Sequence, residues 1–270
     1  MKLTVLISQK SQGWLAITCL CAALLASPAN EALARTLEQV KSLGAISMCA
    51  NPDALPYAAS KGDLPGFQIE IGRAIAEGLG VPLNVDWIFP RRRARVVNCD
   101  MMLDTVNDPE VYKGRLLLSR PYQKTGIGLG VGPNAANVNG FEDIQKGQKS
   151  QKIGVMIGSV SSVVLGKRGF YTSPYAFQSD MLEDLIKGEL FGIAISPATM
   201  SYYIKQHPEA GLRLVNAYDS EPELAWTVSV GLRQSDAALQ DMVNAVLEKL
   251  LADGTITRIY AKYGLEHRLP

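Results

Sequence analysis

The sequence predicts an α/β protein of two lobes that two extended segments join, a hinged clamshell with a binding cleft between the lobes. Three observations support this fold class. The first part of the chain alternates strand and helix patterns, the alternation starts again after residue 133, and a long amphipathic helix follows an extended return segment. The chain has 270 residues, 47% hydrophobic and 20% charged, so it can bury cores of this size.

The elements of the first lobe follow from short apolar runs and one clear helical period. Residues 45–50 are apolar and end at an Asn-Pro pair, as in a buried strand that opens into a loop. From Gly66 to Gly80, apolar residues recur every four positions, which predicts a helix. The other expected elements are strands at 83–88 and 100–103 and a short basic helix from Pro90. This order predicts a parallel sheet with right-handed crossovers.

The second lobe begins after residues 124–132, where apolar residues alternate with glycine and predict an extended connector. Its expected elements are a helix near Phe141, a strand at 152–156, a helix from Ser159, a strand near Ala176, a helix at 181–187, a strand at 190–195 and a helix at 197–206. Residues 225–232 predict the return, and a helix from Leu239 to Leu251 then completes the first lobe. We expect residues 35–123 and 226–270 to form lobe 1 and residues 124–225 to form lobe 2.

Residues 1–34 predict a secretory signal peptide. Lys2 and Lys10 precede the apolar run 14–26, and small residues ending at Ala34 offer a cleavage point. The run is shorter than the roughly 20 apolar residues that span a bilayer, and no later stretch reaches that length. We therefore expect cleavage near Ala34 and a periplasmic protein with no membrane span, with an uncleaved N-terminal anchor as the alternative.

The net charge and the few histidines and cysteines limit which partners, metals and covalent links are expected. Lys+Arg 27 against Asp+Glu 26 gives a formal net charge of +1, which argues against a nucleic-acid partner. The two histidines show no metal-ligand spacing with the cysteines, so no metal site and no cofactor are expected. Signal cleavage leaves only Cys49 and Cys99, which predicts one disulfide in an oxidising compartment, with two buried free thiols as the alternative.

Several motifs occur in a recognisable order. They are Pro56-Tyr57, Leu64-Pro65-Gly66-Phe67, Ser119-Arg120-Pro121-Tyr122, Ile153-Gly154-Val155 with Gly158-Ser159, and Asp253-Gly254 through Lys262-Tyr263-Gly264. Together they resemble the periplasmic solute-binding proteins of the amino-acid-binding kind (family 3, type II), over nearly the whole mature chain. The resemblance implies the two-lobed periplasmic-binding-protein clamshell with two hinge crossings, a small polar ligand and an ABC permease as partner.

The charged groups that hold an amino acid in that family are absent here. The resemblance places Tyr112 at the arginine that pairs with the ligand α-carboxylate, and Ser196 at the aspartate that takes the α-amino group. Charged partners offset the free-energy cost of removing the two charges of a zwitterion from water, and without them much of that cost remains. The resemblance therefore implies a small non-standard polar solute in place of an ordinary amino acid.

Other cleft candidates come from their positions in the pattern. Tyr57 and Trp87 offer aromatic walls, or else ordinary packing at strand ends. The serines after Gly158 open a helix and either hold an anion or only cap the helix. Asp104 and Thr105 follow the third strand, where open parallel sheets collect ligands, or cap a turn. The full set of expected cleft residues is Asp53, Tyr57, Trp87, Asp104, Thr105, Tyr112, Ser159, Ser161 and Ser196.

A narrower set of motifs points elsewhere. Cys49-Ala50-Asn51-Pro52, Leu55-Pro56-Tyr57, Trp87 with Pro90, Arg92-Arg93, Cys99-Asp100 and Arg120-Pro121-Tyr122 resemble the accessory proteins encoded with quinoprotein (PQQ-dependent) methanol and alcohol dehydrogenases. The resemblance implies a role in the assembly or activation of a periplasmic quinoprotein dehydrogenase. Arg91, Arg92 and Arg93 would then meet an acidic partner surface or a carboxylate-rich ligand such as PQQ, or else form a solvated helix face.

We interpret the chain as such an accessory protein and not an enzyme, with a transport receptor as the first alternative. The second alternative is a dehydratase, because cyclohexadienyl dehydratases share this fold. That reaction needs a carboxyl group as acid beside a cationic clamp, and Asp104, Asp108 or Glu110 near Arg115 are the candidates. No nucleophile motif or phosphate loop accompanies them.

Overall fold

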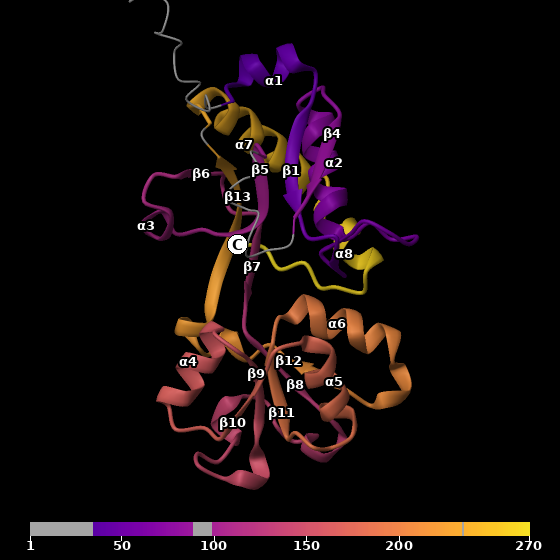
Figure 1. The fold of residues 1–270 in the computed structure, drawn as a ribbon, viewed down its shortest axis with the longest axis vertical. Coiled ribbons are helices and arrows are strands. Elements are labelled where there is room, and N and C mark those ends of the chain that lie inside the picture. The colour runs from indigo at the N-terminus through magenta and orange to yellow at the C-terminus, as the bar shows by residue number, and fades with distance from the viewer. Residues whose placement is uncertain (1–34, 89–98, 234) are drawn as a thin grey trace, which may run out of the picture. The chain divides into compact units, whose positions relative to one another are not determined.

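A computed structural model describes residues 35–88, 99–233 and 235–270. It has the expected mixed α/β architecture with two lobes, each built on one β-sheet with helices packed on it (Figure 1). The predicted signal peptide, the basic helix from Pro90 and the arginines Arg91, Arg92 and Arg93 lie outside the described residues. Within the described ranges, no helix combines the length and the hydropathy that a membrane span requires.

The sheet of the first lobe has the strand order β4-β1-β5-β13-β6, and β7 also pairs with β13. The strands are β1 (Ile46–Ala50), β4 (Leu83–Trp87), β5 (Met101–Val106), β6 (Leu116–Leu118), β7 (Gln123–Gly126) and β13 (Ala225–Arg233). As predicted, β1 runs parallel to both β4 and β5. The return strand β13 runs antiparallel to β5, β6 and β7, so the sheet as a whole is mixed.

Helices from both ends of the chain pack on this sheet. They are α1 (Leu37–Leu43), α2 (Phe67–Gly78), α7 (Ala237–Ala252) and α8 (Thr255–Lys262), with the single turn α3 (Pro109–Tyr112) after β5 and the small hairpin β2 (Asp53–Ala54) and β3 (Ala58–Ala59) after β1. The four-residue period of α2 buries Phe67, Ile71 and Ile75, as the sequence predicts. These side chains join one core with the buried faces of α7 and α8.

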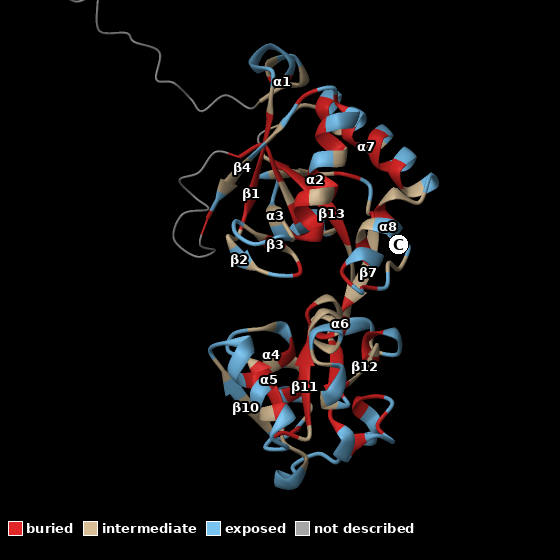
Figure 2. Ribbon diagram, turned by 90° about the vertical axis from the view of Figure 1, so that its right-hand side faces the viewer, coloured by how far each residue is buried: buried red, intermediate tan, exposed pale blue. Residues whose placement is uncertain are grey.

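The sheet of the second lobe has the order β10-β9-β11-β8-β12. Its elements are β8 (Gly128–Val131), β9 (Ile153–Met156), α4 (Val160–Lys167), β10 (Thr172–Tyr175), α5 (Gln178–Ile186), β11 (Gly192–Ile195), α6 (Pro197–Gln206) and β12 (Arg213–Val215). The strands β9, β10 and β11 are parallel, and β8 is antiparallel to β11. In Figure 2 the central strand β11 is buried, whereas the edge strand β10 is mostly of intermediate exposure.

Two predictions for this lobe are wrong in detail. Residues 124–132, expected as a connector, form β7 and β8, so they cross between the lobes and also contribute a strand to each sheet. Glycine makes this packing feasible, because a Cβ at Gly130 would lie 2.7 Å from Met200 Sδ. The helix expected near Phe141 is only a turn of 3-10 helix, Phe141–Asp143.

The crossings between the lobes lie side by side. Gly126 at the end of β7 pairs with Ala225 at the start of β13. A Cβ at Gly126 would lie 2.2 Å from Leu224 O, so the close approach of the two segments requires glycine there. The C-terminal segment lies against this hinge: Lys124 N donates to Arg268 O (2.8 Å), and Arg268 Nη1 donates to Asp219 Oδ2 (2.7 Å) beside the second sheet.

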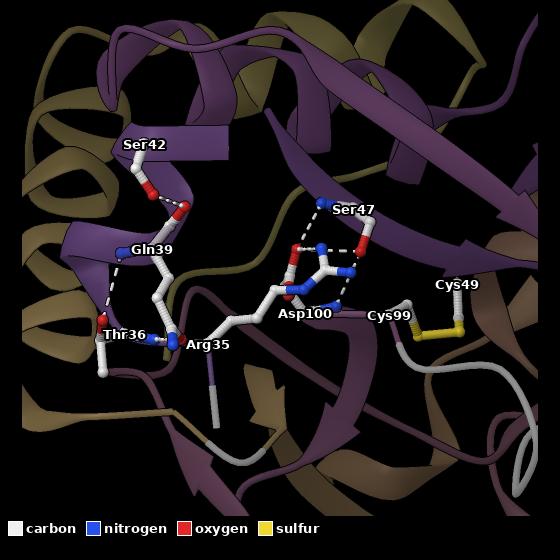
Figure 3. A network of polar contacts seen from close by, with 8 residues as sticks. All are labelled: Arg35, Thr36, Gln39, Ser42, Ser47, Cys49, Cys99 and Asp100. Carbon is white, nitrogen blue, oxygen red and sulfur yellow. Dashed lines mark hydrogen bonds and ion pairs between the residues drawn. A yellow bond between two sulfur atoms is a disulfide. The ribbon is translucent and has the colours of Figure 1, made fainter. Parts of the chain in front are cut away.

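A buried carboxylate anchors one end of the first sheet (Figure 3). Asp100 is 3% exposed and accepts hydrogen bonds from Ser47 N (2.7 Å), Ser47 Oγ (2.9 Å) and Arg35 Nη1 (3.0 Å). The predicted disulfide between Cys49 and Cys99 is formed next to it, with the Cα atoms 5.5 Å apart. Both links tie the start of β5 to β1.

The disulfide is expected to contribute measurably to the free energy of unfolding. Replacing both cysteines, Cys49→Ser with Cys99→Ser, is expected to lower the free energy of unfolding by about 4 kcal/mol, because the bridge closes a loop of about fifty residues in the unfolded chain. Urea denaturation measures the change. The wild type in reductant serves as the control and should match the double variant, whereas a loss below about 1 kcal/mol would show that the bridge constrains little.

The Asp100 network gives a second prediction. Asp100→Ala is expected to lower the free energy of unfolding by about 3 kcal/mol, because it leaves the Ser47 N–H buried without an acceptor and Arg35 without its counter-ion. The exposed Asp63, replaced by Ala in the same way, should change stability by less than about 0.5 kcal/mol. Equal effects of the two substitutions in urea denaturation would contradict the anchoring role of Asp100.

Candidate ligand-binding site

The candidate site lies at the carboxyl ends of the parallel strands, where open α/β sheets bind ligands. Tyr57 lies in the loop after β1, Asp104 in the last part of β5, and Ser196 directly after β11. The hydroxyl groups of Tyr57 and Ser196 form a hydrogen bond. This contact joins the first lobe to the N-terminus of α6 in the second lobe.

Local packing fixes the position of Tyr57. Its ring lies 5.0 Å from the ring of Phe67, centroid to centroid, at the start of α2. The peptide oxygen of Tyr57 accepts from Gln68 N at 3.0 Å. Gly66 has a φ of 97°, and a Cβ there would lie 2.3 Å from Tyr57 O, so only glycine lets the loop approach the helix this closely. The loop therefore presents the Tyr57 hydroxyl at a defined place.

Asp104 is the unusual group of the site. It has a positive φ of 69°, which few residues other than glycine adopt within a strand. Its backbone N–H donates to the Tyr122 hydroxyl at 3.4 Å. No hydrogen bond or ion pair of its carboxylate is found within residues 35–88, 99–233 and 235–270. The side chain reaches solvent, but the surrounding protein displaces enough water to raise its pKa to about 7.

Tyrosine side chains surround this carboxylate. Burial raises the pKa values of Tyr57, Tyr122 and Tyr260, and the Asp104 charge adds to the increase in each case. Tyr122 and Tyr260 are fully buried. The Tyr260 hydroxyl donates to Gln123 Oε1. All these phenols are therefore neutral at physiological pH, so the site around Asp104 combines neutral hydroxyl groups with a single carboxylate.

His267 supports the two buried tyrosines from the C-terminal segment. Its ring lies 4.9 Å from the ring of Tyr260, and its Nε2 is 2.8 Å from Tyr122 O. Burial lowers the pKa of His267, which favours the neutral ring. Sequence reasoning missed Tyr122, Tyr260 and His267 as members of the site. A sequence pattern could have identified Tyr122, because it ends the hinge motif, but no pattern pointed to Tyr260 or His267.

Tyr112 comes close to the same group. It ends α3, is half-buried, and its pKa is raised by burial and further by the charges of Asp104 and Asp108. Thr105 is placed differently: it is buried, and its Oγ1 donates to Met102 O. A Cβ added at Gly231 would lie 2.7 Å from Thr105 Oγ1, so this side chain faces β13 and not Asp104.

The remaining expected cleft residues have local roles. Ser159 is the N-cap of α4 and accepts from Ser162 N at 3.1 Å, and the buried Ser161 hydroxyl is bonded to Ser159 Oγ at 2.9 Å. The capping interaction, one of the two roles expected for these serines, is therefore present, and the anion-binding role stays a prediction. Trp87 ends the edge strand β4 and is 38% exposed, and Asp53 is exposed in β2. Neither has a direct contact with the Tyr57–Asp104 group among the described residues.

The carboxylates considered for a dehydratase do not gather around Arg115. Asp108 caps α3 by accepting from Glu110 N at 3.0 Å, and Glu110 is exposed. Arg115 Nε donates to Tyr112 O at 3.0 Å, and within the described chain no ion pair joins Arg115 to a carboxylate. Among the described residues, no hydrogen bond or ion pair joins Asp104, Asp108 or Glu110 to Arg115.

A small enclosed cavity lies beside the hinge and is distinct from the Asp104 group. It has a volume of about 30 Å³, and Gln123, Ser201, Tyr218, Tyr260 and Arg268 are among its lining residues. A cavity of this size holds about one water molecule and no organic solute. Across the described residues, no three His, Cys, Asp or Glu side chains cluster as a metal site would require.

Comparison with known proteins agrees with this architecture. The model of the "Bacterial extracellular solute-binding proteins, family 3" matches residues 46–266. A "Probable histidine-binding protein" of Neisseria gonorrhoeae is 23% identical over 262 residues, 93% of this chain and 94% of that protein. An "L-arginine-binding protein" of Pseudomonas aeruginosa is 24% identical over 213 residues, 75% of this chain and 80% of that protein.

Solved structures show the same fold. An "Ancestral Cationic Amino Acid Solute Binding Protein (AncCDT-1)" superposes with a TM-score of 0.71 at 21% identity, covering 84% of this chain and 99% of that structure. The substrate-binding protein AbpA of Streptococcus pneumoniae, bound to L-arginine, has a TM-score of 0.65 at 19% identity, covering 84% and 97%. The sequence relatives described above are named as binding proteins, not enzymes.

The raised pKa of Asp104 predicts a pH-dependent effect of Asp104→Asn. The folded-state pKa of about 7 exceeds the ordinary value of 3.8, so the folded protein binds more protons than the unfolded chain between these values. Wild-type stability therefore falls as pH rises through this window. The stabilisation by Asp104→Asn should grow from pH 4 to pH 7 and reach about 1 kcal/mol at pH 8, a reduced figure because the side chain reaches solvent.

Urea denaturation at several pH values measures this difference. Asparagine tolerates a positive φ, so the substitution keeps the backbone conformation. A stability difference that does not change between pH 4 and pH 8 would contradict the raised pKa of Asp104.

Proposed function

Because the chain belongs to the bacterial extracellular solute-binding proteins, family 3, we propose that it is the substrate-binding protein of an ABC transporter for a small polar solute other than an ordinary amino acid. The observation that carries the proposal is the Tyr57–Ser196 hydrogen bond, which joins the two lobes beside Asp104, whose carboxylate has no partner among the described residues. Solute-binding proteins of two lobes take their ligand between the lobes.

The family is described as extracellular, which supports a periplasmic location and the export signal proposed for residues 1–34. Relatives named as amino-acid-binding proteins of ABC transporters support a permease as partner. One of these is the "Probable amino-acid ABC transporter-binding protein" of Haemophilus influenzae. Because those relatives bind small molecules, they support a small solute for this protein. The identity of that solute has to be inferred from the chemistry of this site.

That chemistry favours a solute other than an ordinary amino acid. Tyr112 stands where the resemblance places an arginine, and its raised pKa keeps it uncharged, so it offers an α-carboxylate no counter-ion. Ser196 stands at the expected aspartate, and its hydroxyl already bonds to Tyr57 and accepts from Thr199 N. Among the described residues, a zwitterion in this site would therefore lack a counter-ion for its α-carboxylate, whereas Asp104 offers a carboxylate to its ammonium group.

The test is identification of the bound solute. Protein purified under native conditions is denatured, and the released small molecules are identified by mass spectrometry. The solute found should raise the melting temperature, because at 100 times Kd binding stabilises the folded state by about 2.7 kcal/mol. Absence of any released solute, together with no thermal shift across a library of sugars, amino acids, amines and carboxylic acids, would overturn the proposal.

The Tyr57 hydroxyl gives a matched pair of variants for the same assay. Tyr57→Phe is expected to weaken solute affinity about tenfold, because it removes the hydrogen bond to Ser196 that joins the lobes. Tyr171→Phe removes a hydroxyl from an exposed tyrosine of the second lobe and should leave the affinity within about twofold. Titration calorimetry measures both, and equal affinities of the two variants would show that the Tyr57–Ser196 contact does not support binding.

The accessory role in a quinoprotein dehydrogenase system is the second candidate. It rests on the sequence motifs around Cys49, Cys99 and the arginines 91–93, and the comparisons with known proteins favour the transport role over it. Co-purification with a periplasmic quinoprotein dehydrogenase, lost in an Arg92→Ala and Arg93→Ala double variant, would support the accessory role. A transport receptor predicts solute binding with no such contact.

A further inference from the structure

The chemistry of the site limits the class of solute. Asp104 supplies a carboxylate with no cation beside it among the described residues, and its pKa is already raised by loss of water. A cation that enters the site would replace that lost hydration and form a charge-assisted hydrogen bond. An anion would instead meet a like charge.

The two helices of the second lobe that follow the strands β9 and β11 begin with capping serines. Ser159 accepts from Ser162 N at the start of α4, and Ser196 accepts from Thr199 N at the start of α6. Each cap uses one of the free N–H groups at the start of its helix, and Pro197 at the start of α6 has no N–H to offer. Together with the neutral Tyr112, this leaves the described part of the site without a strong partner for a negative charge.

The carboxyl edges of both sheets also carry exposed apolar side chains. In the second lobe Ile157 follows β9, Val160 opens α4 and Phe177 follows β10, with exposed fractions of 58%, 53% and 65%. In the first lobe Leu55 lies in the loop after β1, and Trp87 ends β4. Exposed apolar side chains at these strand ends are available to contact the apolar part of a ligand.

We propose that the solute is a small organic amine with an apolar body and no carboxylate group, and that Asp104 binds its ammonium. This inference rests on the proposed transport function and specifies its substrate class. The Tyr57 hydroxyl, which can donate its own hydrogen to Ser196, accepts from a second N–H group of the ammonium, and the apolar side chains at the sheet edges contact the body of the amine.

Asp104 also makes binding depend on pH. The described titratable groups that interact with it are Tyr57, Tyr112, Tyr122 and Tyr260, each with a raised pKa, and Asp108 lies on the same side of Tyr112. The phenols stay neutral up to pH 8, so ionisation of Asp104 controls the charge that the ammonium meets. Binding should therefore release a proton near neutral pH.

The test compares amines with the amino acids from which they differ by a carboxylate: tyramine with tyrosine, histamine with histidine, and agmatine with arginine. Titration calorimetry at pH 8 should show at least one amine binding ten times more tightly than its parent amino acid. Asp104→Asn should weaken that amine about ten- to a hundredfold, the usual effect of losing a charge-assisted hydrogen bond. The matched control Asp63→Asn removes an exposed carboxylate from the loop before α2 and should stay within about twofold.

A measurement on the wild type keeps the test decisive if Asp104→Asn does not fold. From pH 6 to pH 8, affinity for the amine that binds most tightly should rise about tenfold, following the ionised fraction of a group with a pKa near 7. Calorimetry in two buffers of different ionisation enthalpy should show release of about half a proton at pH 7.

Each outcome decides between the two claims. Tighter binding of a parent amino acid than of its amine, or a native solute that carries a carboxylate, overturns the amine inference and leaves the transport function standing. An amine affinity that Asp104→Asn and pH do not change also overturns the inference. Failure of every solute class to bind overturns the transport function and the inference together, and a native solute identified as an amine without a carboxylate supports both.

Discussion

The strand β13 is the element on which both the fold and the candidate site depend. It pairs antiparallel with β5, β6 and β7, so the returning chain is held at the crossing and along the first sheet. Only after this return can α7 and α8 pack on the first sheet. Their residues Leu239, Tyr260 and Tyr263 are part of the core that also contains Phe67, and Phe67 in turn supports the ring of Tyr57. The geometry of the site thus depends on contacts between the two ends of the chain.

The sequence predicts the elements that have a strong period or clear end signals. The helices α2, α6 and α7 are of this kind, and α6 has the predicted bounds because Ser196-Pro197 begins it and His207-Pro208 ends it. Short elements were not predicted: α1 and α8 have seven and eight residues, too few for a reliable period, and β12 has three. The strands β7 and β8 resemble a connector in sequence because their glycines are selected by packing against neighbours that are distant along the chain.

The candidate site was predictable only in part. Tyr57, Asp104 and Ser196 follow parallel strands, so their placement at one edge can be inferred from the sequence. The raised pKa of Asp104 was not accessible in this way, because it depends on how much water the folded chain removes around the carboxylate. Tyr260 lies more than 150 positions from Asp104, and a sequence without folded geometry gives no reason to connect them. The serines after Gly158 show how one local pattern allows two roles: the structure shows the helix cap, and the ligand role stays a prediction.

The last residues of the chain have a mechanical consequence for the two lobes. Arg268 is bonded through its peptide oxygen to the hinge strand β7 and through its guanidinium to Tyr218 and Asp219 beside the second sheet. Any movement of one lobe against the other must carry this short segment along or separate it from one side. The contacts of Arg268 therefore add stiffness to the hinge, and a substitution that removes its guanidinium would loosen the coupling between the hinge strand and the second sheet.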